Sequence, residues 1–212
     1  MPQVPLEGCS LGPARELETG RLKLRQWQSA DLEPFARMNA DARVMEYFPA
    51  ILSRNESNEL AERMRSLIAE RGWGFWVAER KLSGEFIGVV GLHIPAANLP
   101  FSPCVEIGWR LAFPFWGHGY ATEAAREALR FAFAELYLPE IVSFTAVCNL
   151  RSRAVMRRLN MRPEPDTFQH PGIPEGHMLR EHALYRLPRA VWQSADNQEA
   201  RPPGLPNQVL PA

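Results

Sequence analysis

Two glycines, Gly117 and Gly119, lie where an apolar stretch gives way to the helix-like segment YATEAAREALRFAF. The start of a helix offers N–H groups that have no intrahelical acceptor, and it carries the positive end of the helix dipole. Glycine also lets an anion approach the backbone without a Cβ in the way. The turn could therefore hold a pyrophosphate, although two such glycines alone more often make only a tight connection between a strand and a helix.

Two common phosphate-binding motifs do not account for this turn. The chain has no GxxxxGK[ST] sequence, and GHGYAT lacks the third small residue of the dinucleotide motif GxGxxG. The turn therefore points to a different phosphate-containing ligand.

A second chemical group, the carboxylate of Glu106, lies in a predicted strand over residues 104–112. Alternation puts Val105, Ile107, Trp109 and Leu111 on one face of this strand, and Cys104, Glu106, Gly108 and Arg110 on the other. The small residues at 104 and 108 leave room beside Glu106 for an amine, which a carboxylate could deprotonate directly or through one water. The alternative is a solvated strand carboxylate paired with Arg110, and the strand alone favours neither interpretation.

The elements that would position these groups alternate between strands and helices. The sequence predicts, in order, strand 22–26, helix 29–39, a helix from the capping box Ser53/Glu56 to near Gly72, a hairpin of strands 75–79 and 86–93, strand 104–112, helix 120–137, strand 141–147, helix 150–160 and strand 182–187. Two strands that flank one helix form a βαβ unit, so part of the sheet should be parallel.

Composition narrows the class of protein. The chain has 212 residues with 24 basic and 24 acidic side chains, so no overall field draws it to nucleic acid or to an anionic membrane. It has neither a basic segment followed by an apolar run at the start nor the roughly 18 consecutive apolar residues of a membrane helix, which predicts a cytoplasmic protein. We expect one domain over residues 17–193, between a flexible N-terminal tail (1–16) and a disordered C-terminal tail (194–212).

The three cysteines do not form a recognisable motif. Cys9, Cys104 and Cys148 are widely spaced and lack a CxxC pair, which argues against disulfides and against a zinc site. Cys104 and Cys148 fall in apolar runs and are expected to be buried as small hydrophobic residues.

Several segments together resemble the GNAT superfamily of N-acetyltransferases, specifically its RimJ/RimL-like branch of ribosomal-protein N-terminal acetyltransferases and their relatives. The segments are ETGRLKLRQW, GEFIGVVGL, VEIGWRL, FWGHGYATEAAREAL and NLRSRAVMRRLNM, and the resemblance covers residues 18–188. The family signature is Q/R-x-x-G-x-G/A. Here Gly117 and Gly119 match it, but Pro114 occupies its first position.

The resemblance implies an α/β fold with a central mixed, twisted sheet of about six to seven strands flanked by helices, whose fourth and fifth strands splay apart to admit the coenzyme. It implies acetyl-CoA as co-substrate and no metal. Backbone groups of Leu111, Ala112 and Phe113 would pair with the pantetheine arm. The pyrophosphate would be held by N–H groups of Gly117, His118, Gly119, Tyr120, Ala121 and Thr122.

The resemblance also gives side-chain roles. Glu106, in the motif EIG, stands where RimL-like enzymes have their catalytic glutamate. Asn149 is suited to cap the helix that follows it, and together with Ser152 it would contact the coenzyme. Many GNAT enzymes have a tyrosine seven residues after that asparagine to protonate the leaving thiolate, but this position is Met156, so Ser152, Tyr120 or water remain alternatives.

The predicted reaction is direct transfer of an acetyl group to a primary amine in a ternary complex, without an acetyl-enzyme. The acceptor would be a protein N-terminus or a small amine, and both a monomer and a homodimer remain open. A noncatalytic acyl-CoA-binding sensor or subunit is the alternative function.

Two further groups of residues have open roles. Arg151, Arg153, Arg157 and Arg158 are expected to form a solvated basic face rather than a site for the 3′-phosphate. The loop from His170 to His182 could wall the acceptor pocket together with Met45, Tyr47 and Phe48, or all of these could simply be packing.

Overall fold

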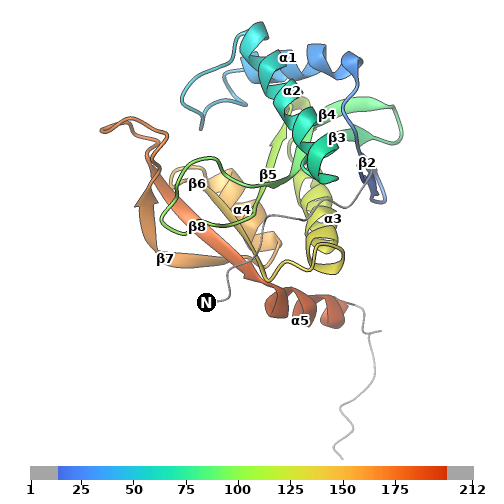
Figure 1. The fold of residues 1–212 in the computed structure, drawn as a ribbon. Helices are drawn as coiled ribbons and strands as arrows, with labels where there is room; N and C mark the ends of the chain where they lie inside the picture. The colour runs from blue at the N-terminus through green and yellow to red at the C-terminus, as the bar shows by residue number, and fades with distance from the viewer. Residues whose placement is uncertain (1–13, 200–212) are drawn as a thin grey trace, which may run out of the picture.

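The computed structural model describes residues 14–199, which fold around one mixed sheet of eight strands in the order β1-β2-β3-β4-β5-β6-β8-β7 (Figure 1). The strands are β1 Leu17–Glu18, β2 Leu22–Arg25, β3 Phe75–Arg80, β4 Glu85–His93, β5 Glu106–Leu111, β6 Glu140–Ala146, β7 Arg162–Gln169 and β8 Glu181–Pro188. The helices are α1 Leu32–Ala40, α2 Arg54–Arg71, α3 Tyr120–Ala134, α4 Leu150–Arg158 and α5 Arg189–Glu199. Only β5 and β6 pair in parallel, and every other neighbouring pair is antiparallel.

Local signals account for the element that they predicted best, helix α2. The Ser53 side chain accepts from the backbone N–H of Glu56, and the Glu56 carboxylate accepts in return from the N–H of Ser53, as a capping box requires. At the other end Gly72 has a φ of 82°, the left-handed conformation that ends a helix. The predicted start and end of this helix are confirmed.

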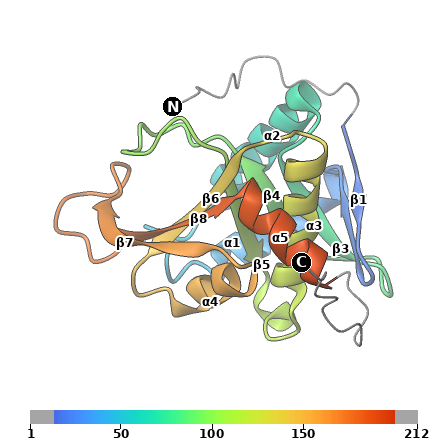
Figure 2. The ribbon, with the colours of Figure 1, turned by 90° about the horizontal axis from the view of Figure 1, so that it is seen from below.

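Helices cover both faces of the sheet. Helix α3 packs on β4 and β5 through a buried face rich in alanine, and α5 lies beside α3, with the rings of Phe133 and Trp192 5.7 Å apart (Figure 2). Helices α1 and α2 pack against each other at one end of the molecule, on the opposite face (Figure 1). The small alanine side chains of α3 let it approach the sheet closely.

Strands β5 and β6 separate along their length, as the resemblance predicted. Strand β4 pairs with β5 at six positions, whereas β5 pairs with β6 only at Glu106 and Val142. The N–H of Val142 donates to the carbonyl of Val105 at 3.0 Å, and the Ser143 hydroxyl donates to the carbonyl of Ile107 at 2.9 Å. Beyond these contacts the two strands diverge, which opens a gap at their carboxyl ends.

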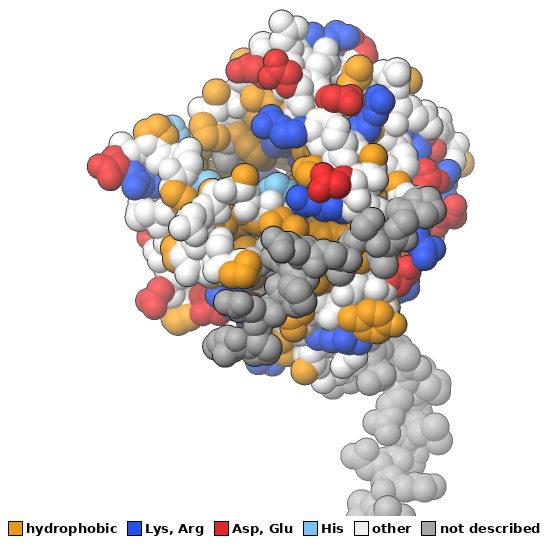
Figure 3. Space-filling model, in the orientation of Figure 1, with side chains coloured by type: hydrophobic (Ala, Val, Ile, Leu, Met, Phe, Trp, Pro, Cys, Tyr) orange, Lys and Arg blue, Asp and Glu red, His pale blue; other side chains and the backbone are white. Residues whose placement is uncertain are grey.

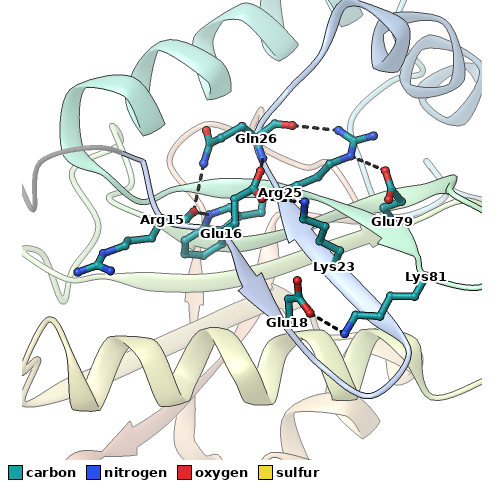
Figure 4. Close-up of polar contacts among 9 residues, drawn as sticks. Arg15, Glu16, Glu18, Lys23, Arg25, Gln26, Glu79 and Lys81 are labelled. Carbon is teal, nitrogen blue, oxygen red and sulfur yellow. Dashed lines mark hydrogen bonds and ion pairs between the residues drawn. The ribbon is translucent and has the colours of Figure 1, made fainter.

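Arg15 and Glu16, which directly precede the predicted domain, contact residues of β2 and β3 and the chain beside them. The carbonyl of Arg15 accepts from the Gln26 amide at 3.1 Å and from the Trp76 indole at 2.7 Å. Glu16 forms an ion pair with Lys23 at 2.9 Å (Figure 4). Residues 1–13 of the predicted tail lie outside the described residues.

Helix α5 extends across residue 193, where the sequence predicted the end of the domain. This helix runs from Arg189 to Glu199 and therefore continues past residue 193. The rest of the predicted tail, residues 200–212, lies outside the described residues.

A buried ion cluster joins β2, β3 and the start of α1. Two nitrogens of Arg25 each donate to one oxygen of Asp31 at 2.8 Å. Its Nε donates to Glu79 at 2.5 Å (Figure 4). Arg25 is 6% exposed and Asp31 is 2% exposed. These contacts raise the pKa of Arg25, because Asp31 and then Glu79 bind its charged form.

The prediction that the cysteines are buried was wrong for the two residues that the structure describes. Cys104 is partly exposed and Cys148 is exposed, and both are free thiols; Cys9 lies outside the described residues. Over residues 14–199, no helix combines the length and the apolar character needed to cross a membrane.

Candidate active site

The turn before α3 has the shape of an anion cradle. Gly117 and Gly119 have φ values of 80° and 79°, both in the left-handed region that favours glycine. The first bond within the helix is donated by Glu123 to Gly119 at 3.0 Å, so the N–H groups of Tyr120, Ala121 and Thr122 have no intrahelical acceptor. A Cβ built at Gly117 would meet no protein atom within 4 Å. Open space at the positive end of a helix suits a pyrophosphate.

A polar network fixes the first turn of α3 to the chain before β2. The Glu123 carboxylate accepts from the Thr19 hydroxyl at 2.5 Å and from the N–H of Arg21 at 2.9 Å. The guanidinium of Arg21 pairs with the same carboxylate at 2.6 Å and lies 4.5 Å from the ring centroid of Tyr120. This network holds the cradle in place and neutralises the carboxylate beside it.

An open pocket of about 530 Å³ adjoins the cradle. Its charged lining includes Arg126 and Arg158 but also Glu123 and Glu127. Glu123 pairs with Arg21 and Glu127 pairs with Arg130 at 2.7 Å, so both carboxylates of the lining are already neutralised by partners outside it.

The backbone of β5 presents hydrogen-bonding groups to the gap. The N–H of Ala112 donates to the carbonyl of Ile87 at 2.9 Å, so Ala112 is bonded to β4. Along an antiparallel pair, residues whose backbone groups bond to the partner strand alternate with residues whose groups point away from it. The backbone groups of Trp109 and Leu111 therefore point away from β4, into the gap towards β6. Their N–H groups fit a pantetheine arm laid along this strand.

Two backbone positions that were predicted to bind the arm are already engaged. Both backbone groups of Ala112 are used, since its carbonyl accepts from Phe115 at 3.0 Å. The carbonyl of Phe113 accepts from the N–H of Trp116 at 3.1 Å, and that of Leu111 accepts from the Trp116 indole at 2.7 Å. Of the predicted groups, the N–H of Leu111 is the one that faces the gap, and the sequence-based prediction overlooked Trp109.

Asn149 caps α4, as its sequence position predicted. Its side-chain oxygen accepts from the N–H of Ser152 at 3.1 Å, and its amide nitrogen donates to Thr145 at 3.0 Å and to the Ser152 hydroxyl at 3.2 Å. These bonds occupy the side-chain groups that the coenzyme arm would contact.

The candidates for the general acid separate in space. Tyr120 lies against Arg21, and its hydroxyl bonds with Arg80, so it is directed towards the paired strands β2 and β3. Met156 is buried. Ser152 is bonded to Asn149 at the start of α4.

The arginines of α4 do not form one solvated face. Arg151 pairs with Glu46 and lies 4.8 Å from the ring centroid of Trp116, while Arg153 donates to the carbonyl of Val147 at 2.9 Å. Arg157 and Arg158 are exposed, as the sequence predicted.

Glu106 lies on the face of the sheet opposite α3, where the gap between β5 and β6 begins. In the part of the chain that the structure describes, its carboxylate has neither a hydrogen bond nor an ion pair, so the predicted alternative of pairing with Arg110 is not observed. Its side chain is only partly exposed, and burial raises its pKa to about 8. A carboxyl group with this pKa is tuned towards the range in which an α-amino group titrates.

The immediate neighbours leave the Glu106 charge uncompensated. His93 lies directly opposite Glu106 on β4, and burial lowers the pKa of the imidazole, so the ring is neutral at pH 7. Burial, and secondarily the charge of Glu106, raise the pKa of the Cys104 thiol to about 11. Cys104 is therefore a poor nucleophile at neutral pH.

The predicted room at Gly108 is already filled. A Cβ at this position would lie 3.0 Å from Cζ of Phe75, whose ring packs 5.8 Å from that of His93. The glycine therefore admits the Phe75 ring rather than a substrate, and the ring forms an apolar floor beside Glu106.

Aromatic residues and histidines gather on the same face, beyond β6. Phe101, Phe144, Phe168, His170 and His182 form a cluster in which the two histidine rings are 4.9 Å apart. Burial lowers the pKa of His182 to about 4. Figure 3 shows a hollow on this face, between the α1–α2 end and the β6–β8 side, with apolar and histidine side chains at its edge.

The residues of the segment before α2 that were predicted as possible pocket walls differ in their exposure. Met45 is buried in the core, whereas Tyr47 and Phe48 are partly exposed. Residues 14–199 include no group of three or more His, Cys, Asp or Glu side chains placed to hold a metal ion.

Comparisons with known proteins agree with this geometry. Residues 21–162 match the family model of the acetyltransferase (GNAT) domain. The chain belongs to the GNAT acetyltransferase family. This acetyltransferase is 32% identical over 188 residues to the FsC-acetyl coenzyme A-N(2)-transacetylase of Aspergillus fumigatus, a match that covers 83% of this chain and 77% of that protein.

Solved structures show the same fold. An acetyltransferase from Agrobacterium tumefaciens has 27% identity and a TM-score of 0.66, covering 82% of this chain and 94% of its own. RimL, a ribosomal L7/L12 alpha-N-protein acetyltransferase solved with coenzyme A, has a TM-score of 0.64 at 18% identity, covering 84% of this chain and 99% of its own. The α/β fold predicted from the resemblance is confirmed, but the sheet has eight strands rather than the predicted six to seven.

Proposed function

We propose that this acetyltransferase moves the acetyl group of acetyl-CoA to a primary amine by direct transfer, with Glu106 as the general base. The observation that carries the proposal is the uncompensated carboxylate of Glu106, with a pKa near 8, at the mouth of the gap between β5 and β6. Acetyl-CoA would supply the acetyl thioester. The N–H groups of Tyr120 to Thr122 would hold its pyrophosphate, and those of Trp109 and Leu111 its pantetheine arm.

Separate groups of the chain would act as the base, as the donor to the thioester oxygen and as the source of the returning proton. Glu106 takes the proton from the amine, because only a free amine attacks a thioester. A backbone N–H of β5 stabilises the negative charge that develops on the thioester oxygen. Ser152 or a water returns a proton to the departing thiolate. The neutral Cys104 thiol supports direct transfer rather than an acetyl-cysteine.

The acceptor is an amine of a small molecule or of a protein N-terminus. The Aspergillus relative, named as an N(2)-transacetylase, supports a small-molecule amine, and the fold shared with RimL supports a protein N-terminus. The absence of a strong net charge and of a predicted membrane segment supports action in the cytoplasm.

Thiol release from acetyl-CoA tests the proposal. The purified protein is screened against peptide N-termini and small amines, together with the variants Glu106→Gln and Glu62→Gln. The second is a matched control, because the Glu62 side chain is 62% exposed on α2. We expect Glu106→Gln to bind acetyl-CoA normally but to lose turnover by about 100-fold or more, within the range for general base catalysis.

The same experiment separates the noncatalytic alternative. Binding of acetyl-CoA without thiol release on any acceptor would indicate a sensor or subunit. Equal turnover by wild type and Glu106→Gln would remove Glu106 from the role of base.

A further inference from the structure

Arg110, on the same face of β5 as Glu106, is a cation without an anionic partner. Its Nη1 donates to the side-chain oxygen of Asn39 at 2.7 Å, and its Cζ lies 4.0 Å from the ring centroid of Phe48. Its Nε is buried and has no hydrogen-bond partner. Within residues 14–199 no carboxylate pairs with Arg110, and its Nη2 makes no hydrogen bond.

A purely structural role leaves this arrangement unexplained. The contact to Asn39 ties β5 to the end of α1, but Asn39 is already fixed by a bond to Ser57 at 2.9 Å and by one from the N–H of Leu52 at 3.0 Å. One hydrogen bond to an amide does not offset the cost of enclosing a charge. Nη2 remains able to donate to a carboxylate, which a guanidinium binds more strongly than it binds a neutral amide.

Arg110 and Glu106 are separated by a defined distance and surface. Four residues of extended strand put their Cα atoms about 13 Å apart. Between them lies Gly108, covered by the ring of Phe75, whose Cζ would be 3.0 Å from a Cβ at that position. We call this surface, formed by Glu106, Phe75 and Arg110, the acceptor face. It offers a base, then an apolar floor, then a cation.

We infer that the acceptor carries a carboxylate as well as its amine, and that the guanidinium of Arg110 binds this carboxylate through Nη2 while the amine lies at Glu106. The spacer between the two groups lies over Phe75. This inference rests on the proposed function, because it assumes that the amine reacts beside Glu106. The α-amine and the carboxylate of a single amino acid are too close together to span the acceptor face. A dipeptide, at up to about 3.6 Å per residue, covers more than half of the roughly 13 Å, and the side chains of Glu106 and Arg110 bridge the rest.

Matched acids and amides test the inference. Initial rates of thiol release are measured for alanine, Ala-Ala and Ala-Ala-Ala, each against its C-terminal amide, so that each pair differs only in the carboxylate. We expect wild type to prefer Ala-Ala or Ala-Ala-Ala over its amide by tenfold or more in kcat/KM, and to show little preference for alanine over alaninamide.

Variants then assign the preference to one side chain. In Arg110→Met the ratio of acid to amide should fall towards one. Arg110→Lys keeps a cation of similar length but not the planar guanidinium, so it should retain only part of the preference. This variant is used if Arg110→Met does not fold. Arg186→Met is the control, because Arg186 lies on the same face of the sheet but is already paired with Glu140 at 2.6 Å.

Equilibrium binding separates this inference from the proposed function. Isothermal titration of Ala-Ala and its amide into the protein saturated with coenzyme A reports binding without turnover. Carboxylate-dependent binding that Arg110→Met abolishes supports the inference even if no acceptor reacts. Equal use and equal binding of acids and amides by wild type, or a carboxylate preference that survives in Arg110→Met, would overturn it while leaving the transferase reaction intact.

Discussion

Two partly or fully buried arginines in this acetyltransferase, Arg25 and Arg110, have opposite surroundings. Arg25 is bonded to both oxygens of Asp31 and to Glu79, and these contacts raise its pKa. Arg110 has one amide partner and a buried Nε without any, and burial lowers its pKa to about 10. Glu106, four residues from Arg110, is also uncompensated, and its pKa moves in the direction of its neutral form.

The difference separates charges that serve the fold from charges that serve a ligand. A buried ion that only stabilises the native state finds its counter-ion within the chain, as Arg25 does. An ion that must meet a substrate cannot be neutralised in advance, since its partner would compete with that substrate. The β2–β3 region and the acceptor face should therefore respond differently to loss of their charges.

The largest expected effect is on the pH dependence of stability at Glu106. Because its folded-state pKa of about 8 lies above the value of 4.5 expected in the unfolded chain, the folded state binds the proton more tightly, and its stability falls as pH rises between those values. The loss is at most about 5 kcal/mol by pH 9. Glu106→Gln does not titrate, so urea unfolding at pH 5 and pH 9 should show the variant gaining on wild type as pH rises.

A double difference provides the control for that experiment. All other groups titrate in both proteins, so the change in the free energy of unfolding from pH 5 to pH 9 is compared between them. Parallel curves would mean that the carboxylate is solvated in the folded protein.

The next largest effect contrasts the two arginines directly. Arg25→Met leaves Asp31 buried without its cation and should lower the free energy of unfolding by about 3–5 kcal/mol. Arg110→Met removes a charge without a counter-ion, at the expense of the bond to Asn39 and the contact with the Phe48 ring, so its loss should be smaller. Chemical denaturation at pH 7 measures both. Equal losses would erase the distinction between the two regions.

The smallest effect concerns the cradle, which uses backbone rather than side-chain charge. Gly117→Ala and Gly84→Ala both place a Cβ at positive φ, 80° and 67°, in open space. Their strain should be similar, about 1–2 kcal/mol each. Only Gly117 adjoins the proposed pyrophosphate, so acetyl-CoA affinity should fall about tenfold in Gly117→Ala and remain unchanged in Gly84→Ala. Isothermal titration measures both, and equal weakening would mean that the effect is general strain.

The sequence predicted elements whose signals are local. Helix α2 was predicted from its cap residues and Gly72, and the β3–β4 hairpin from two apolar runs and a short turn. Strand β7 was missed because it is exposed almost throughout and contains two prolines, so it shows no alternation. Strand β1 is only two residues long, too short for a periodic pattern.

The site was predictable only in part. Glycine spacing and strand alternation identified the cradle and Glu106, and the family resemblance added their roles. Whether Glu106 pairs with Arg110 depends on Asn39 and Phe48, which hold Arg110 from α1 and the segment that follows it. The Phe75 ring over Gly108 likewise depends on the register of three strands. Such contacts are non-local, so no pattern within one segment carries them.

The most direct test of the account is the pH dependence of kcat/KM for wild type and Glu106→Gln with the same acceptor. The acceptor amine titrates identically in both, so the ratio of the two rates isolates the carboxylate. We predict that this ratio rises about tenfold per pH unit up to about pH 8, the pKa of Glu106, and is level above it. A ratio that stays constant from pH 6 to pH 9 would contradict the claim that Glu106 is the base.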